Sequence, residues 1–296
     1  MSEKKISYGE MYKKCRETLE NRGVPEADLD ARLILDYVCG TTHHDLLAHG
    51  DMELAPDKEK EAEKLISLRA ERIPLSQLTG QREFMGLDFH VTGDVLTPRQ
   101  DTETLVEEAL ILIHDGMRFM DICTGSGCVA LSILNYTNDT AAVATDISES
   151  ALEIASENAD RLLLTDRIRF EHCDLFPDAY NGEKFDMIVS NPPYIRTKDI
   201  DTLEPEVRDH EPRLALDGGE DGLCFIRRIA EDARRYLYSD GWLLLETGFD
   251  QGKEASVILK DAGYREVEIV KDLGGKDRVV KGCWIDSNRS FTDMRR

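Results

Sequence analysis

The sequence predicts an α/β protein in which a doubly wound, mostly parallel sheet follows a small helical domain. Apolar residues recur at helical spacing over residues 1–75, whereas from Thr97 onward short apolar strands alternate with amphipathic helical stretches. Strands that alternate with helices of this length form a mostly parallel sheet with helices on both faces. The 296 residues are enough for two domains, each with its own core.

Residues 1–75 are expected to form the helical domain. Ser7 and Glu10 have the spacing of a capping box, which opens a first helix. Pro56 suits the first turn of a later helix that runs toward Arg72, and Pro74 marks its end. A helix between these two is expected from the apolar residues Leu33, Ile34, Leu35 and Val38.

A short hairpin around Gly86-Leu87 is expected to link the domains over residues 76–96. The sheet domain is expected over residues 97–284, followed by a frayed tail at 285–296. Its candidate strands are Arg118–Cys123, Ala141–Thr145, Ile168–Cys173, Phe185–Ser190, Trp242–Glu246, Glu266–Val270 and Arg278–Lys281. Its candidate helices include Glu149–Arg161, Leu223–Leu237 and Gln251–Ala262.

The charge of the chain limits its partners. The formal net charge is −22, and −17 of it falls on residues 101–296. Proteins that bind bare nucleic acid use Lys and Arg to release counterions from phosphates, so this charge argues against a DNA or RNA partner. The pairs Arg227-Arg228 and Arg234-Arg235 are expected on solvated helix faces. No apolar run approaches the ~20 residues of a membrane span and no signal sequence is visible, so a cytoplasmic protein is expected.

Neither a disulfide framework nor a metal site is predicted. The seven cysteines are odd in number and scattered, and no Cys-x-x-Cys pair occurs among them. This pattern is typical of reduced thiols. His43, His44 and His49 lie close together in sequence but lack a matching cysteine or carboxylate pattern, so we expect them in a solvated loop.

The first strand of the sheet leads into a glycine loop, Asp121-Ile-Cys-Thr-Gly-Ser-Gly127, which opens a helical run. Gly125 and Gly127 let the backbone approach a ligand at a strand-to-helix turn. With Ala130 they also fit a loose dinucleotide fingerprint. That signal is weak, and it leaves a nicotinamide-dependent oxidoreductase open as an alternative.

Three carboxylates at the ends of successive strands favour a different ligand. Asp121 precedes the glycines, where it opposes a pyrophosphate but suits an ammonium group. Asp146 ends the next strand and can accept hydrogen bonds from both ribose hydroxyls, and Asp174 follows the third strand, where it can meet an adenine edge. Each acid alone could simply cap the following helix. Together they fit a nucleoside that carries positive charge, S-adenosylmethionine.

The fourth strand, Phe185–Ser190, runs directly into Asn191-Pro-Pro-Tyr194. In isolation this tetrapeptide could be a simple turn. Next to a sulfonium site it suits methylation of a planar nitrogen, whose delocalised lone pair is a weak nucleophile. The Asn191 side-chain oxygen and the Pro192 carbonyl can accept both N–H bonds, the two prolines fix that carbonyl, and Tyr194 can stack on the planar group. No dedicated general base is required, because the nitrogen becomes strongly acidic as the methyl transfers.

The combination of Asp-x-x-Thr-Gly-Ser-Gly with Asn-Pro-Pro-Tyr resembles the class I amino-methyltransferases, which have a Rossmann-like doubly wound sheet. Their substrates are planar nitrogens in adenine, cytosine or glutamine. Further segments narrow the resemblance to the HemK-like, release-factor glutamine N5-methyltransferases, and extend it over nearly the whole chain. These segments are Pro74–Gly80, Glu83–Phe89, Thr97–Glu103 and Glu211–Leu223.

The resemblance implies methylation of the glutamine in the Gly-Gly-Gln loop of class-one bacterial peptide chain release factors, with S-adenosylmethionine as the methyl donor. It also implies that the helical domain helps to hold the release factor, and we expect a monomer that binds no nucleic acid or membrane. Carried over by position, the catalytic residues are Asn191, Pro192, Pro193 and Tyr194. The expected cofactor-binding residues are Asp121, Thr124, Gly125, Ser126, Gly127, Asp146, Asp174 and Asn191.

Two positions depart from the family pattern. Cys123 stands where the family usually has glycine, and Gln100 where it usually has proline. We expect Cys123 to be tolerated because it is small, which leaves open whether its backbone needs a positive φ. Arg99 and Glu103 are expected to have a structural ion-pair role rather than to contact substrate. Glu211-Pro-Arg213 is expected to shape the substrate-side wall.

Alternatives to a glutamine methyltransferase stay open at this point. An adenine-N6 methyltransferase would use the same tetrapeptide on a base flipped out of DNA or RNA, but it needs a basic groove, which the charge of −17 over residues 101–296 disfavours. A non-catalytic module that binds the release factor is disfavoured by the intact tetrapeptide. The acidity also predicts a partner with a basic face.

Overall fold

The computed structural model describes residues 6–177 and 182–286, and the chain forms two compact units. The helical unit comprises Met1–Gln81 together with Glu204–His210, and the sheet unit comprises Arg82–Leu203 together with Glu211–Arg296. The domain limits expected from sequence stay a prediction, and the tail expected at 285–296 lies outside the described residues from 287 onward. The short excursion over Glu204–His210 was not anticipated from sequence.

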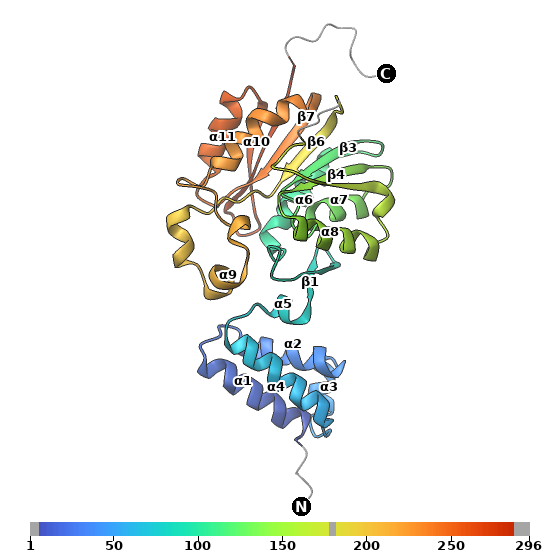
Figure 1. Ribbon diagram of the computed structural model, residues 1–296, viewed down its shortest axis with the longest axis vertical. Coiled ribbons are helices and arrows are strands. Elements are labelled where there is room, and N and C mark those ends of the chain that lie inside the picture. Colours follow the sequence, from blue (N-terminus) through green and yellow to red (C-terminus); the bar gives the residue numbers. More distant parts are fainter. Residues whose placement is uncertain (1–5, 178–181, 287–296) are drawn as a thin grey trace, which may run out of the picture. The chain divides into compact units, whose positions relative to one another are not determined.

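The helical unit packs its helices around an apolar core that includes Tyr8, Ile34 and Leu35, all fully buried (Figure 1). Its N-terminal helices are α1 (Tyr8–Asn21), α2 (Ala27–Cys39), α3 (His43–Ala48), α4 (Pro56–Ala70) and α5 (Leu75–Thr79). The expected capping box is present at α1, because the Ser7 hydroxyl accepts from the Glu10 amide at 3.2 Å and the Glu10 carboxylate accepts from the Ser7 amide at 3.0 Å.

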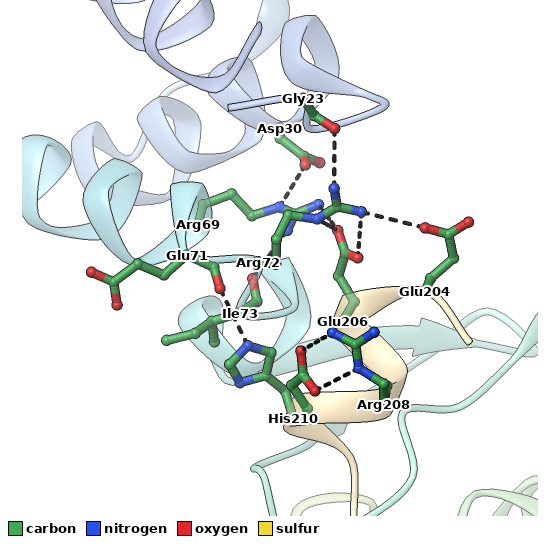
Figure 2. Close-up of polar contacts among 11 residues, drawn as sticks. Gly23, Asp30, Arg69, Glu71, Arg72, Ile73, Glu204, Glu206, Arg208 and His210 are labelled. Atoms are coloured by element: carbon green, nitrogen blue, oxygen red, sulfur yellow. Dashed lines mark hydrogen bonds and ion pairs between the residues drawn. The ribbon is translucent and has the colours of Figure 1, made fainter. Parts of the chain in front are cut away.

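The excursion contributes helix α9 (Pro205–His210), which is held by two arginines, one in the last turn of α4 and one two residues beyond its end (Figure 2). Arg72 donates to both oxygens of the Glu206 carboxylate, from Nε and from Nη2, each at 2.6 Å. Arg69 donates to Glu206 Oε1 at 2.9 Å and to Asp30 at 2.7 Å. Arg72 also reaches the Gly23 carbonyl, at 3.0 Å. Charge-assisted bonds of this forked kind are among the stronger polar contacts in proteins, so α9 is an integral part of the helical unit.

In the sheet unit, strands β3 to β9 form one sheet in the spatial order β5-β4-β3-β6-β7-β9-β8. The pairs from β5 to β7 are parallel, and β9 runs antiparallel to both of its neighbours. This confirms the expected doubly wound, mostly parallel sheet. The strands are β3 (Arg118–Ile122), β4 (Ala141–Asp146), β5 (Ile168–His172), β6 (Phe185–Ser190), β7 (Leu237–Glu246), β8 (Arg265–Lys271) and β9 (Asp277–Trp284).

The strand order reverses between β3 and β6, which places a crevice beyond their carboxyl ends. Helices seal both faces of the sheet, as Figure 1 shows, so ligand access is concentrated at that edge. Leu105 and Leu131 belong to the apolar cluster on one face, and Ile226 and Leu259 to the cluster on the other. The helices that supply them include α6 (Gln100–Leu112), α7 (Cys128–Asn135), α8 (Glu149–Arg161), α10 (Cys224–Asp232) and α11 (Gly252–Asp261).

A hairpin precedes the sheet, as expected from its alternating apolar residues. Its strands are β1 (Gln81–Phe84) and β2 (Leu87–His90). The rings of Phe84 and Phe89 are both buried and meet edge to face, with centroids 6.1 Å apart. Gly86 provides the positive φ of 70° that the tight turn requires.

Several element limits differ from the sequence-based expectation. The helix expected to reach Leu237 ends as α10 at Asp232, and strand β7 starts at Leu237 rather than at Trp242. Leu237 is buried and Tyr238 is exposed, so the period here is two and not that of a helix. β3 stops at Ile122 rather than at Cys123, whose backbone turns out of the strand. The candidates Phe185–Ser190 and Glu149–Arg161 keep their expected limits as β6 and α8, and the other candidate strands and helices are present with ends that shift by at most three residues.

The histidine cluster was expected in a loop, and this prediction is wrong. His43 and His44 open helix α3, and His49 follows its last residue. The sequence signal for this helix is the pair Thr42 and Asp45: the Thr42 amide donates to the Asp45 carboxylate at 2.8 Å, as in an N-terminal cap. All three histidines are exposed. Within residues 6–177 and 182–286, no group of three His, Cys, Asp or Glu side chains is arranged to hold a metal ion.

Candidate active site

A cavity of about 220 Å³ opens at the carboxyl ends of β3, β4 and β6. It brings together most of the residues that the sequence analysis selected. The expected residues that line it are Asp121, Thr124, Gly125, Ser126, Asp146, Asp174, Asn191 and Pro193. Gly127, Pro192 and Tyr194 are not among the described residues that line it, although they lie next to residues that do.

Asp121 lies in β3, just before the glycine loop, and is 1% exposed. Its Oδ2 accepts from the Thr124 hydroxyl at 2.7 Å and from the Ala130 amide at 3.2 Å. Burial nevertheless raises the pKa of Asp121 to about 7, because those bonds only partly replace water. A positive charge nearby, such as an ammonium group, would stabilise the ionised form of this buried carboxyl group.

Gly127 shows why the loop needs glycine at its end. It has a φ of 80°, and a Cβ added there would lie 3.0 Å from Leu131 and 3.2 Å from Ala155. The backbone therefore turns into α7 at a point where two helices pack closely. The Ser126 hydroxyl beside it is buried and has no partner among the described residues, and Ser126 lines the cavity.

Cys123 has a φ of 59°, which settles the question that its departure from glycine raised. The chain does need a positive φ at this point, and here a cysteine adopts it at some cost in strain. Burial raises the pKa of the Cys123 thiol well above its usual range, so the sulfur is a neutral part of the cavity wall.

Asp146 and Asp174 line the cavity from the ends of β4 and β5. The Asp146 carboxylate accepts from the Gly125 amide and from the Ser148 amide, both at 2.9 Å, which fixes its orientation. Burial raises the pKa of Asp146, and these two backbone bonds oppose that effect. Asp174 is more exposed and pairs with Arg228 at 2.8 Å. Arg228 is exposed, as expected, and it also lines the cavity.

Asn191 follows the last residue of β6 and lines the cavity. Its side-chain Nδ2 donates to the Thr102 hydroxyl oxygen at 3.1 Å. The amide oxygen therefore lies on the other side of the group, away from Thr102 and available as an acceptor. Pro192 is buried and Pro193 lines the cavity, so the tetrapeptide forms part of the wall.

The backbone of the tetrapeptide rests against a glycine-rich return segment. A Cβ added to Gly218 would lie 2.7 Å from Tyr194 Cα and 2.8 Å from the Pro193 carbonyl oxygen, so only glycine allows this approach. The Gly218 amide donates to the Ile195 carbonyl at 2.8 Å, and the Gln251 side chain donates to the Tyr194 carbonyl at 2.9 Å. These contacts fix the main chain of the tetrapeptide from two sides.

Tyr194 directs its hydroxyl to a carboxylate that the sequence analysis did not select. It donates to Glu246 Oε1 at 3.1 Å, and Glu246, the last residue of β7, is 1% exposed. Burial raises the pKa of Glu246 to about 7, against the opposing effects of Thr102, Arg278 and Tyr194. The available signal was its position, since Glu246 ends a strand at the same edge of the sheet as Asp121 and Asp146.

Arg99 and Glu103 both have structural partners, but Glu103 is not in an ion pair as expected. Arg99 donates to the buried Glu211 carboxylate at 2.6 Å, and Arg99 and Pro212 both line the cavity. Glu103 instead accepts from the Met85 amide at 2.8 Å, in the turn of the hairpin. Sequence reasoning also missed Thr102 and Phe225, both of which line the cavity.

Comparisons with known proteins agree with this architecture. The PrmC N-terminal domain family model matches residues 10–80, and the methyltransferase small domain model matches residues 101–218. A solved methyltransferase from Pyrococcus furiosus has the same fold, with a TM-score of 0.51 and 20% identity over 68% of this chain and 90% of that one. The sheet, the glycine loop and the cavity beyond β3, β4 and β6 define a class I methyltransferase.

Relatives define the family more narrowly. The release factor glutamine methyltransferase of Clostridium acetobutylicum is 41% identical over 85% of this chain and 89% of its own length. The protein of the same name from Caulobacter vibrioides is 39% identical over 90% of this chain and 93% of its own length. The chain belongs to the release factor glutamine methyltransferase family, which confirms the resemblance found in the sequence.

Proposed function

We propose that this protein transfers a methyl group from S-adenosylmethionine to the side-chain amide nitrogen, N5, of the glutamine in the Gly-Gly-Gln motif of class-one bacterial peptide chain release factors. The observation that carries the proposal is the placement of Asn191. Its amide nitrogen is committed to Thr102, so its oxygen is left to accept an N–H group at the wall of the cavity that Asp121, Asp146 and Asp174 also line.

The residues of the cavity fit S-adenosylmethionine. The Asp121 carboxylate is buried with a raised pKa, so a cationic amino group nearby would stabilise its charge. Asp146 is held by two backbone amides and can accept from ribose hydroxyls, and Asp174 lies beyond β5, where an adenine edge can reach it. The buried Ser126 hydroxyl, which has no hydrogen-bond partner in the part of the chain that the structure describes, adds a polar group with which the ligand can bond. When bound, S-adenosylmethionine supplies a methyl carbon on a positively charged sulfur.

The tetrapeptide solves the problem of a weak nucleophile. The glutamine amide nitrogen has its lone pair delocalised into the carbonyl, and acceptance of both N–H bonds by Asn191 Oδ1 and the Pro192 carbonyl would aim that lone pair at the methyl carbon. The new N–C bond forms as the S–C bond breaks, which leaves S-adenosylhomocysteine, and the nitrogen then releases one proton. Because sulfonium charge is lost in the transition state, positioning in a shielded cavity supplies most of the catalysis.

An adenine-N6 methyltransferase acting on DNA or RNA is the competing function. It uses the same chemistry at the tetrapeptide, but the acidity of residues 101–296 disfavours a phosphate backbone. A monomer in the cytoplasm remains our expectation, and no helix of the described residues is long and apolar enough to cross a membrane.

Mass spectrometry of a release factor after reaction tests the proposal. The full chain is incubated with S-adenosylmethionine and a class-one release factor, and in parallel with total cellular nucleic acid. We expect one added methyl group on the Gly-Gly-Gln glutamine and none on nucleic acid. The Asn191→Ala variant should still bind S-adenosylmethionine but lose about 2–4 kcal/mol of transition-state stabilisation. Methylation of nucleic acid alone would establish the competing function instead.

A further inference from the structure

Asn158 is a fully buried polar side chain that the reaction proposed above does not use. It lies in α8, is 0% exposed, and is not among the described residues that line the cavity. A side-chain amide offers two N–H donors and an acceptor oxygen, and a buried one is unfavourable unless these groups find partners. The partners of Asn158 therefore indicate what the residue does.

The Asn158 amide pairs with the backbone of His90, the last residue of β2, in the way that a neighbouring strand would. Its Oδ1 accepts from the His90 amide at 2.7 Å, and its Nδ2 donates to the His90 carbonyl at 3.0 Å. A backbone N–H can only donate and a backbone carbonyl can only accept, so this pair fixes the orientation of the side-chain amide. One N–H of Asn158 is left for a third partner.

That third partner belongs to the glycine loop. Asn158 Nδ2 donates to the Ser126 carbonyl at 2.9 Å. Ser126 precedes the N-cap of α7, so its carbonyl has no place among the bonds of that helix, and the amide four residues ahead, that of Ala130, donates to Asp121. Ser126 is 2% exposed, and a buried carbonyl of this kind needs a partner from outside the loop. Asn158 supplies it.

The glycine loop is thus held at three successive residues. Asp121 and Asp146 hold it at Thr124 and at Gly125, and both of these carboxylates line the cavity. Asn158 holds the next residue from outside the cavity wall. It is therefore the anchor that can be changed without the removal of a side chain that faces the ligand.

The hairpin is a fixed support for this anchor. Phe84 and Phe89 are buried in the apolar cluster that includes α6 and α7. In the turn between them, the Met85 amide donates to Glu103 at 2.8 Å and the Met85 carbonyl accepts from the Tyr136 hydroxyl at 2.6 Å. Because the hairpin is fastened at its turn and by both strands, a bond to it holds the glycine loop against the core.

We propose that Asn158 is a positioning residue for the cofactor, which joins the Ser126 carbonyl to the hairpin and so holds the glycine loop in its binding conformation before S-adenosylmethionine arrives. The proposal rests on the proposed function, because it concerns the cofactor side of the same site. Without this bond the loop would populate other conformations. The affinity for the cofactor would then fall in proportion to the fraction of molecules that keep the binding conformation.

Binding and kinetics of Asn158→Leu in the full chain test this role. Leucine has a similar size but no polar atoms, so it removes all three hydrogen bonds while α8 stays packed. We expect the Kd for S-adenosylmethionine, measured by calorimetric titration, to rise roughly 5–50-fold, as is typical of a buried acceptor that loses its partner. At saturating S-adenosylmethionine, the kcat and the KM for the release factor should stay within about threefold, because the tetrapeptide is unchanged.

Leu164→Ala is the matched control for general damage to the fold. Leu164 is 7% exposed, belongs to the same apolar cluster as Ala159 of α8, and is not among the described residues that line the cavity. It should lower the denaturation midpoint while the Kd for S-adenosylmethionine stays within about twofold. An unchanged Kd in Asn158→Leu, or an equal rise in both variants, would overturn the proposal. If Asn158→Leu does not fold, Asn158→Ala removes the same bonds and is judged by the same criteria.

Hydrogen exchange of the ligand-free protein gives a second test. The Gly125 and Gly127 amides report on the loop, since they donate to Asp146 and to the Thr124 carbonyl, both at 2.9 Å. In Asn158→Leu these two amides should exchange roughly tenfold faster, while the amides of β3 and β4 keep their rates. Loop exchange at the wild-type rate overturns the positioning role, whatever the protein methylates. A wild-type protein that binds S-adenosylmethionine but leaves the release factor unmethylated overturns only the proposed function.

Discussion

Cys123 carries a side chain in a backbone conformation that glycine adopts without strain. Its φ of 59° follows directly from the need to turn out of β3 toward the glycine loop. A non-glycine residue in this region is less stable by about 1–3 kcal/mol, and a β-branched residue is worse still. The chain tolerates this strain next to the cavity that holds its proposed cofactor.

We predict that Cys123→Gly leaves the free energy of unfolding unchanged or raises it by up to about 1 kcal/mol, because relief of strain exceeds the entropy that glycine adds to the unfolded chain. Cys123→Val should lower it by roughly 1–3 kcal/mol. Chemical denaturation of both variants measures these values. Cys224→Ala, at an exposed position in α10, is the matched control and should have little effect. A Cys123→Gly protein that is clearly less stable would show that the thiol contributes more than the strain removes.

Asp121 makes the stability of the ligand-free protein depend on pH, and the sign of this dependence follows from its raised pKa. Its pKa of about 7 in the folded protein exceeds the value of 3.8 for an unperturbed aspartate, so between these pH values the folded state holds a proton that the unfolded state has lost. This contribution to stability is present below pH 4 and is lost as the pH rises toward 7. Glu246 acts with the same sign, because burial raises its pKa from 4.5 to about 7.

The corresponding variant is Asp121→Asn, which keeps the shape and an acceptor oxygen for Thr124. In the absence of ligand it should be more stable than the wild type at pH 8, by roughly 1–3 kcal/mol, and nearly equal to it at pH 4. At the same time its affinity for S-adenosylmethionine should fall. Thermal unfolding at the two pH values, together with calorimetric titration, measures both effects. A stability difference that grows toward low pH would contradict the assigned sign.

Sequence reasoning found those residues of the candidate site that come directly at or after the end of a strand. Asp121, Asp146 and Asn191 were predicted in this way, since parallel strands bring their carboxyl ends to one edge. Thr102 precedes its partner Asn191 by 89 residues. Such a contact depends on how α6 packs against the sheet, which local periodicity does not encode. The tetrapeptide was therefore predictable, but the hydroxyl and carboxylate behind it were not.

At the scale of elements, hydrophobic periodicity predicted which helices and strands exist better than it predicted the residues at which they begin and end. β7 was expected to start at Trp242 because the alternation at Tyr236-Leu237-Tyr238 followed directly on a helix without a glycine or proline between them. α9 was not predicted at all. It is only six residues long, and the network that holds it joins Arg72 to Glu206 across 134 residues of sequence.

The network around Glu206 predicts a loss of stability when its charge is removed. The side chains of Arg69 and Glu206 are 8% and 18% exposed. Glu206→Gln removes the carboxylate that Arg69 and Arg72 share, which leaves Arg69 with Asp30 and Arg72 with the exposed Glu204 alone. The arginines hold the pKa of Glu206 below its usual value even though burial acts to raise it. We expect the helical unit to lose roughly 1–3 kcal/mol of stability, less than for a fully buried pair because some solvent screening remains.

Hydrogen exchange of the backbone amides in α4 and α9 measures this local stability. Glu204→Gln is the matched control, since the Glu204 side chain is 77% exposed and its carboxylate lies 3.5 Å from the Arg72 guanidinium group. This control should change the free energy of local opening, as measured by hydrogen exchange, by less than about 0.5 kcal/mol. Equal effects of the two substitutions would mean that charge alone, rather than the forked geometry at Glu206, holds the excursion in place.

For the whole molecule, the net charge of −22 predicts how the partner arrives. A release factor with a basic face would be attracted over several ångströms of solvent, and dissolved ions screen such attraction. We expect the association rate constant to fall by about tenfold between 50 and 500 mM salt, with a smaller change in the dissociation rate. Stopped-flow mixing at several ionic strengths measures both. An association rate that does not depend on salt would mean that the acidity serves solubility and not recognition.

The excursion of α9 into the helical unit also has a consequence for biosynthesis. Arg72 leaves the ribosome 134 residues ahead of Glu206, an interval of roughly 7–27 s at 5–20 residues per second. During that time the nascent helices have Asp30 but not Glu206 to pair with the two arginines, and the unit is completed only after strands β3 to β6 have been made. A fragment cut after Gln81 would remain in that unfinished condition. An exchange of this unit between relatives must therefore transplant two stretches of chain, one from each side of the Asn-Pro-Pro-Tyr tetrapeptide.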